Sequence, residues 1–191
     1  MTTYPVRIRK WTRREYARLC ETGVLSEDEP VELIGGQLIV AEPKGSRHAV
    51  GVAIVAERLR SAFGAGWAVR EQTSFALDDE SEPEPDVAVV AGGHRDYRDR
   101  HPSEAALLVE VAESSLAFDR SHKGGAYAKA GVPEYWIVNL VDDVLETYRE
   151  PLPDPAADFG WRYGRTSLLR EGTVTPLARP NITIAIVDLF P

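Results

Sequence analysis

The sequence has very little cysteine and no long apolar run. Its 191 residues include a single cysteine, Cys20, which excludes an internal disulfide and a cysteine-rich zinc site. No stretch reaches the apolar length of a membrane-spanning helix, and the amino end lacks the apolar segment of a secretory signal. These absences predict a soluble protein of the reducing cytoplasm that has no membrane partner.

The chain also lacks an excess of positive charge. It carries 22 Lys and Arg against 30 Asp and Glu, a formal net charge of -8. This balance argues against binding nucleic acid through bulk electrostatics alone, because clustered basic side chains make the phosphate contacts. The charge is uneven: residues 7–18 are rich in basic side chains, and residues 78–86 are rich in acidic ones. We expect both stretches to be solvated surface, and the length predicts a single domain over residues 1–191.

Periodicity and turn residues predict a mixture of helices and strands. A capping box at Thr12 predicts an N-terminal helix that ends near Gly23, and the Gly35–Gly36 pair predicts a β-hairpin of residues 31–34 and 37–40. Two further helices are predicted, from Ser46 to Gly64 and from a cap at Asp119 to residue 130. The predicted strands are 67–77, 86–90, 107–112, 135–139, 144–148, 163–169 and 182–186, with an exposed proline-rich excursion at 151–155.

Two of the predicted strands carry an acid where an apolar residue is expected. Glu110 interrupts the apolar run 107–112, and Asp86 stands at the start of the apolar run 87–90. An unpaired carboxylate in a dry interior is costly, so such a group shifts its pKa, pairs with a cation or binds a metal. If the strands pair, both acids converge at one end of the sheet, where oxygen ligands suit a hard cation such as Mg²⁺ or Mn²⁺.

A lysine follows on the next predicted helix. Lys123 can point back toward the strand end and stabilise charge that develops on a phosphoryl oxygen. Two other readings stay open at this point. Asp119 and Lys123 are four residues apart and can form a surface ion pair. Glycoside hydrolases also use a pair of catalytic carboxylates. Gln72 can face the same cleft, although a solvent-facing strand amide is the stronger expectation for it. The polar loop 92–102 is a candidate cover for a site.

Four ordered blocks of sequence resemble the Uma-two family of putative restriction endonucleases, in the PD-(D/E)XK nuclease superfamily. The blocks are residues 84–90, residues 108–116, Asp119-Arg120 with Lys123, and residues 130–138. The resemblance extends from residue 31 to residue 190. It implies a restriction-endonuclease-like α/β fold, a mixed central sheet flanked by helices, with the N-terminal helix and hairpin added to it.

The resemblance also implies a site and a reaction. It places a divalent metal, Mg²⁺ or Mn²⁺, on Asp86 and Glu110 and predicts hydrolysis of DNA phosphodiester bonds. The superfamily pattern has its lysine two residues beyond the acid, but Ala112 occupies that position here. Lys123 is the matching residue on the following helix. Glu32 and His48 also match recurring positions of the family and, with Asp119, can support the site. An exposed strand residue is an equal alternative for Glu32, and a surface or capping histidine is the favoured alternative for His48.

Three hypotheses about function follow from these residues. The first is a metal-dependent endonuclease with Asp86, Glu110 and Lys123 as its catalytic residues. The second is a nuclease-fold module, dimeric, that binds or assembles with little or no turnover. The third is hydrolysis of a smaller phosphate ester, with the loop 92–102 as a lid. An exposed sheet edge in a small fold of this kind is often covered by a second subunit, so we expect a homodimer.

Overall fold

A computed structural model describes residues 8–26, 29–41 and 44–191 of the chain. The helices and helical turns are α1 (Arg13–Glu21), α2 (Ser46–Phe63), η1 (His94–Tyr97), α3 (Leu116–Phe118), η2 (Asp119–Lys123), α4 (Gly124–Lys129), η3 (Asp158–Gly160) and η4 (Ile186–Leu189). The strands are β1 (Val31–Ile34), β2 (Gln37–Val40), β3 (Trp67–Glu71), β4 (Val87–Ala91), β5 (Leu107–Ala112), β6 (Glu134–Asn139), β7 (Val144–Pro153), β8 (Trp161–Leu169), β9 (Thr173–Val174) and β10 (Ile184–Ala185). No helix among these residues is long and apolar enough to cross a membrane.

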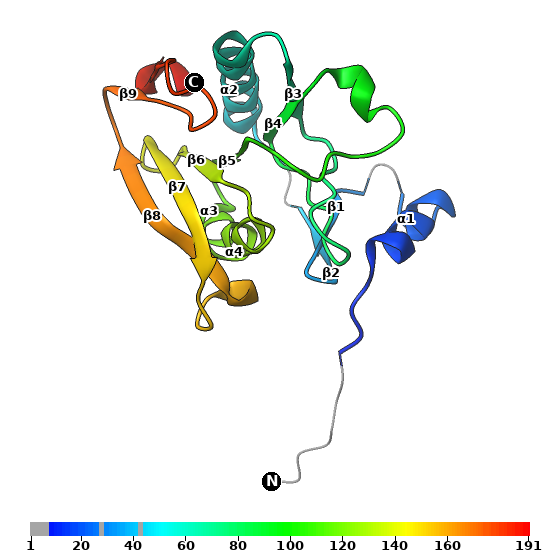
Figure 1. Cartoon of the computed structure of the whole chain (residues 1–191). Coiled ribbons are helices and arrows are strands. Elements are labelled where there is room, and N and C mark those ends of the chain that lie inside the picture. Colours follow the sequence, from blue (N-terminus) through cyan, green and yellow to red (C-terminus); the bar gives the residue numbers. More distant parts are fainter. Residues whose placement is uncertain (1–7, 27–28, 42–43) are drawn as a thin grey trace.

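A six-stranded sheet forms the centre of the molecule (Figure 1). Its strand order is β3-β4-β5-β6-β7-β8. Only β5 and β6 pair in parallel, and every other neighbouring pair in this sheet is antiparallel. A parallel pair needs a crossover rather than a hairpin, and here the crossover is the helical segment from α3 to α4. The mixed sheet flanked by helices confirms the predicted fold class.

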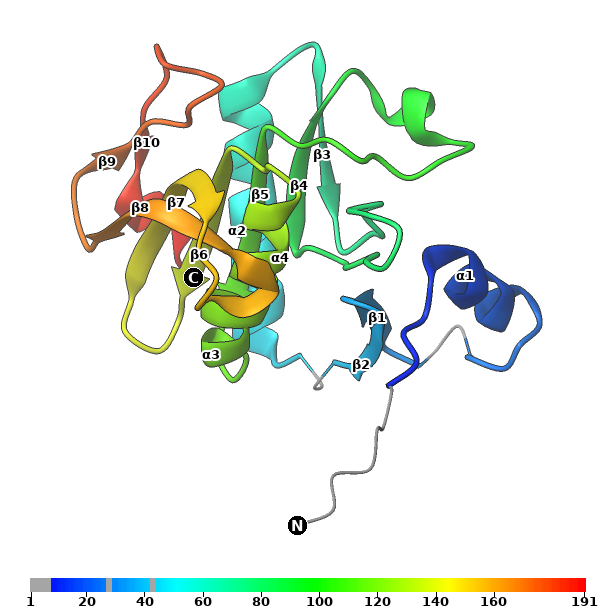
Figure 2. The same cartoon turned by 60° about the horizontal axis from the view of Figure 1, so that its bottom comes forward.

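Helices cover both faces of this sheet. Side chains alternate along a strand, so Leu107, Val109 and Val111 of β5 pack in the cluster that contains α2. Leu108 and Ala112 face the other way, into the cluster that contains α4. In Figure 2, α2 lies behind the central strands and α4 in front of them. Because 110 shares the parity of 108 and 112, the strand alternation sends Glu110 to the side of α4.

The N-terminal helix and hairpin form as predicted. Thr12 and Glu15 make the reciprocal capping box at the start of α1, and Gly23 follows its end with φ of 71°. The β1–β2 turn contains Gly35 and Gly36, with φ of 59° and 78°, values that favour glycine. An isolated bridge between Leu33 and Glu82 fixes β1 against the segment that leads into β4. The hairpin is thereby placed beside the start of that strand.

The acidic stretch before β4 is largely buried, which corrects the expectation of a solvated surface. Glu82 is 9% exposed, and its Oε2 accepts a hydrogen bond of 2.8 Å from Arg13 Nε. Lys129 Nζ likewise lies 3.0 Å from Asp78 Oδ2. Basic side chains from distant parts of the sequence neutralise part of the acidic stretch, and such distant partners leave no local signal.

Two strand boundaries also differ from the prediction. The chain leaves β3 at Glu71, and Gln72 has φ of 46°, so residues 72–77 do not continue the strand. The proline-rich segment belongs to β7 as far as Pro153 instead of forming an excursion. Beyond Arg149, β7 has β8 as its only strand partner, so the missing proline N–H groups interrupt no ladder on the other side.

Candidate metal and phosphate site

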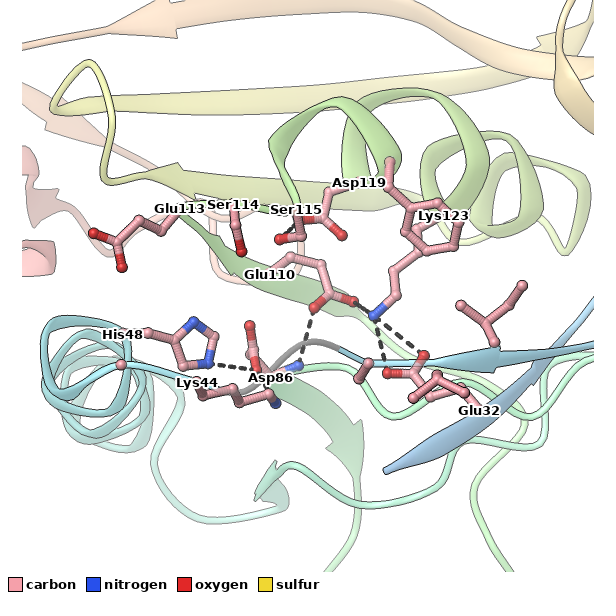
Figure 3. A pocket seen from close by; sticks show the side chains of 15 residues that line it. Glu32, Lys44, His48, Asp86, Glu110, Glu113, Ser114, Ser115, Asp119 and Lys123 are labelled. Atoms are coloured by element: carbon pink, nitrogen blue, oxygen red, sulfur yellow. Dashed lines mark hydrogen bonds and ion pairs between the residues drawn. The ribbon is translucent and has the colours of Figure 1, made fainter. Parts of the chain in front are cut away.

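The two predicted acids meet at one end of β4 and β5. The antiparallel register pairs Val87 with Val109, which sets Asp86 beside Glu110. The backbone N–H of Asp86 donates to Glu110 Oε2 at 3.4 Å, and the N–H of Val111 donates to Asp86 Oδ2 at 2.9 Å. Both acids are 3% exposed. The structure therefore brings the two carboxylates together on rigid strands (Figure 3).

Lys123 completes the predicted trio. Its Nζ lies 3.1 Å from Glu110 Oε1 and 3.2 Å from Glu32 Oε2, and the side chain is buried. The hydroxyl of Tyr127 donates to the same Glu110 oxygen at 2.7 Å. Figure 3 shows Lys123 entering from the helix above and Glu32 from the hairpin below it. The surface ion pair expected between Asp119 and Lys123 is replaced by this buried network.

A π-helical turn directs Lys123 into the pocket. The helix after β5 begins at Leu116, and residues Asp119–Lys123 form the wide turn η2 before α4. Asp119 is therefore inside the helical segment and does not cap it, which corrects the prediction. Its carboxylate accepts a 2.6 Å hydrogen bond from Ser115 Oγ instead. Single π-turns inside helices occur often at functional sites, because the extra residue turns the following side chains.

Three nitrogen-bearing side chains surround Asp86 Oδ1. Lys44 Nζ donates to it at 2.9 Å, Gln72 Nε2 donates at 3.3 Å, and His48 Nε2 lies 3.2 Å away. His48, on the first turn of α2, also contacts the Val111 carbonyl through Nδ1 at 2.8 Å. His48 is thus at the site as predicted. Gln72 is exposed, as expected, and its amide also donates to the Asp86 carboxylate of the site.

Sequence reasoning missed Lys44 and Tyr127. Lys44 precedes His48 by four residues, and Tyr127 follows Lys123 by four, a spacing that places helical side chains on one face. This spacing is the signal that was available for Tyr127. Lys44 lies just before α2, outside helical periodicity, so no comparable signal marks it in the sequence.

The two strand-borne acids and Lys123 line a pocket of about 330 Å³. It is enclosed by the hairpin, the start of α2, the ends of β4 and β5, and the segment from α3 to η2. Its lining residues are Glu32, Ile39, Val40, Ala41, Lys44, Gly45, His48, Asp86, Glu110, Glu113, Ser114, Ser115, Phe118, Asp119 and Lys123. No residue of the loop 92–102 lines it, so the expectation that this loop covers the site is wrong.

The pocket holds more negative than positive charge. Five lining residues contribute carboxylates, against the ammonium groups of Lys44 and Lys123: they are Glu32, Asp86, Glu110, Glu113 and Asp119. Burial raises the pKa of Glu110 well above its usual value, and the charges of Asp86, Asp119 and Glu32 add to this, although Lys123 opposes it. Burial would also raise the pKa of Asp86, but His48, Lys44 and the Val111 N–H outweigh it and hold that pKa below the usual range.

The donor set fits a divalent cation. Raised carboxyl pKa values on clustered acids indicate that the site lacks positive charge, and a hard divalent ion with oxygen ligands supplies it. Among the described residues, no three His, Cys, Asp or Glu side chains already form a complete metal-ligand cluster. The ammonium groups of Lys44 and Lys123 instead hold the oxygens of Asp86 and Glu110. Cation binding at Asp86 therefore requires Lys44 to move away.

Asp119→Asn should remove a pH-dependent loss of stability. Burial raises the pKa of Asp119 from 3.8 to about 6, so the folded chain holds this proton more tightly than the unfolded chain. Protonated Asp119 therefore adds up to about 3 kcal/mol to the free energy of unfolding. This contribution is complete below about pH 4 and is lost as the pH rises through 6. Urea unfolding in EDTA at about pH 4.5 and about pH 7.5 measures it. An unchanged difference between the two pH values in the variant would show that Asp119 is not the titrating group.

Comparison with known proteins supports the resemblance seen in the sequence. A solved structure, a putative nuclease belonging to DUF820 from Anabaena variabilis, is similar with a TM-score of 0.66 and 15% sequence identity, over 89% of this chain and 95% of that chain. A search of the curated proteins gives no match. The model of the Uma2 family, described as "Putative restriction endonuclease", matches residues 13–178. The chain therefore belongs to the Uma2 family of putative restriction endonucleases.

Proposed function

We propose that the protein is a divalent-metal-dependent endonuclease of the PD-(D/E)XK type that hydrolyses DNA phosphodiester bonds. Asp86 and Glu110 would hold Mg²⁺ or Mn²⁺, and Lys123 would be the third catalytic residue. The observation that carries the proposal is the meeting of two buried carboxylates from adjacent strands with a buried ammonium in one pocket. Membership of a family named for restriction endonucleases supports DNA as the substrate.

The metal, when bound, supplies positive charge to a phosphoryl oxygen and lowers the pKa of water in the site. Lys123 adds a fixed positive charge. Although burial favours its neutral form, the charges of Glu110, Glu32, Asp119 and Asp86 raise its pKa above the usual value. A lysine that stays protonated cannot take a proton from water. Its role is therefore to stabilise the negative charge of the pentacovalent phosphorus, with Glu32 holding its ammonium in place.

Asp119, His48 and Lys44 are placed to support this chemistry. Asp119 lines the pocket and carries a raised pKa, so it can hold or release a proton near neutral pH. Lys44 is at the mouth of the pocket, and its side chain is 39% exposed. Once a cation replaces it at Asp86, its ammonium is free to pair with the phosphate backbone of a bound strand. These assignments give the pocket two cationic groups for one anionic substrate.

The pre-existing ion pairs also favour a second candidate function. Lys44 and Lys123 already satisfy Asp86 and Glu110 without a metal, as is required of a nuclease-fold protein that binds or assembles with little or no turnover. The two candidates differ in whether a cation displaces Lys44 and cleavage follows. We propose the enzyme as the principal function, because the surplus of buried acid is unfavourable in a module that binds no cation.

Cleavage of supercoiled plasmid tests the proposal. We expect nicking or linearisation that requires Mg²⁺ or Mn²⁺, stops in EDTA, and is lost in both Asp86→Asn and Lys123→Ala. Asp188→Asn is the matched control, because Asp188 lies outside the pocket, 3.7 Å from Arg58. Cleavage that survives in both site variants would identify a contaminant and contradict the proposal. Plasmid binding without cleavage would support the binding module.

We further propose that the enzyme is a cytoplasmic homodimer. The sheet has two edge strands, β3 and β8, and β8 is largely exposed. An exposed edge is a surface that second subunits commonly cover. Both the oligomeric state and the location stay predictions.

A further inference from the structure

We propose that His48 is the third protein ligand of the metal, through Nε2, and that the site therefore prefers a first-row transition ion such as Mn²⁺ to Mg²⁺. This inference rests on the proposed function, because it assumes a metal on Asp86 and Glu110. It adds a nitrogen ligand to a centre that would otherwise be built from oxygen.

The hydrogen bond at the far side of the ring fixes the free nitrogen. A carbonyl oxygen can only accept, so the Val111 carbonyl, 2.8 Å from Nδ1, requires the proton to be on Nδ1. In the neutral ring, Nε2 then carries an unshared electron pair. This atom is buried and has no hydrogen-bond partner among the described residues. Nε2 and the facing Asp86 oxygen therefore need a positive charge between them. A proton on Nε2 supplies it in the metal-free chain and lowers the pKa of Asp86, and a metal ion can take the place of that proton.

The distance between the two facing atoms is that of neighbouring metal ligands. His48 Nε2 lies 3.2 Å from Asp86 Oδ1 (Figure 3). Two adjacent ligands of an octahedral cation, each about 2.1 Å from it, lie about 3.0 Å apart. The pair can therefore accept one cation with little movement of either strand or helix.

The surroundings of His48 are those of a metal-binding histidine. Such a residue almost always donates its other ring N–H to a carbonyl or carboxylate, which fixes the ring and raises the basicity of the ligating nitrogen. Val111 provides that carbonyl, and it directly follows Glu110 in β5. His48 is itself held on the first turn of an 18-residue helix. One strand therefore orients both the Glu110 carboxylate and the imidazole.

Two neighbours must change partner for the cation to enter. Lys44 and Gln72 donate to the Asp86 oxygen that faces His48. Lys44 has a long, part-exposed side chain and can withdraw into solvent, and Gln72 at 3.3 Å makes only a weak bond. An imidazole ligand suits first-row transition ions, whereas Mg²⁺ keeps oxygen ligands and water. The His48 nitrogen therefore makes the centre prefer Mn²⁺ to Mg²⁺.

Electron spin-echo spectroscopy of Mn²⁺ bound to the metal-free protein tests the inference without reference to activity. We expect modulation from a directly coordinated ¹⁴N, and its replacement by a ¹⁵N signal when only the histidines carry ¹⁵N. His48→Gln should abolish this signal. It should also weaken Mn²⁺ binding by about 10–100-fold or more, because loss of a residue that only supports a metal ligand already costs that much. The change in Mg²⁺ affinity should be smaller. Calorimetry measures both affinities.

His122→Gln is the matched control. His122 also has a buried Nε2 without a hydrogen-bond partner, but it does not line the pocket. If His48→Gln fails to fold, a variant with His94, His101 and His122 all changed to Gln leaves His48 as the only histidine of the chain, and the nitrogen signal must persist. Mn²⁺ that binds in an Asp86-dependent way without any nitrogen signal overturns the His48 ligand and leaves the metal site standing. Absence of Mn²⁺ binding to the native protein overturns both.

Discussion

Lys123→Met should lower the free energy of unfolding of the metal-free protein by about 3–5 kcal/mol at pH 8, the usual loss when one partner of a buried ion pair is removed. The ammonium is buried and lies 3.1 Å from Glu110 and 3.2 Å from Glu32. Methionine fills a similar volume but leaves two carboxylates without their cation. Urea unfolding in EDTA measures the loss, and plasmid cleavage should disappear in the same variant.

The loss should become smaller as pH falls. The pKa of Glu110 is already raised in the native protein by burial and by its acidic neighbours, with only Lys123 opposing the shift. Without Lys123 the pKa rises further, and a raised carboxyl pKa favours the folded state below it and penalises the folded state above it. The difference in stability between the native protein and the variant therefore widens from about pH 5 to pH 8.

Two variants make this result specific. Lys129→Met removes a lysine whose side chain is 40% exposed and pairs with Asp78, and it should cost only about 0–1 kcal/mol. Glu110→Gln combined with Lys123→Met should recover part of the loss, because it removes one of the two stranded charges. Equal stability of Lys123→Met and the native protein at pH 8 would mean that the carboxylates of the pocket do not carry the charges inferred here.

The sequence predicts the two strand-borne acids well because their signal is local. An acid inside an apolar run, as at Glu110, or at its start, as at Asp86, is visible without any knowledge of the fold. The antiparallel pairing that joins them follows from the adjacency of the two strands. Glu32 and His48 are different, since only the family resemblance singles them out. Their contacts with Lys123 and Asp86 span 91 and 38 positions of the chain.

The helix after β5 shows why the remaining details escape sequence reasoning. A short polar residue such as Asp119 predicts a helix cap, yet the segment starts earlier and inserts a π-turn from Asp119 to Lys123. Helical periodicity assumes 3.6 residues per turn, and one wide turn shifts every later side chain. Lys123 reaches Glu110 through this shift. The order of strand and helix indicates that Lys123 can point back toward the strand end, but its contacts with Glu110 and Glu32 could not be derived from regular helical spacing.

Glu110→Gln should separate the metal site from the fold. The amide has nearly the shape of the carboxylate and can still accept the hydrogen bond that Tyr127 donates at 2.7 Å in the native protein. Lys123 keeps Glu32 as its partner. We expect Mn²⁺ affinity to fall by more than about 100-fold, the upper end of what loss of an outer-shell partner costs. Plasmid cleavage should be abolished. Calorimetry and circular dichroism measure the affinity and the fold.

Stability is the part of this result that distinguishes a functional acid from a structural one. Burial and acidic neighbours raise the pKa of Glu110, so its ionised form weakens the fold at pH 8, and Lys123 keeps Glu32 as its partner when Glu110 is lost. The metal-free protein should therefore be as stable with glutamine at pH 8, or more stable. Glu113→Gln is the control, because Glu113 lines the same pocket but is exposed, and its Mn²⁺ affinity should stay within a few-fold of native. Unchanged Mn²⁺ affinity in Glu110→Gln, together with lost stability, would make Glu110 a structural partner of Lys123. If Glu110 lowers the stability of the metal-free fold but strengthens Mn²⁺ binding, its role is to bind the cation. Glu110→Gln measures both effects, since the stability and the Mn²⁺ affinity are determined on the same variant.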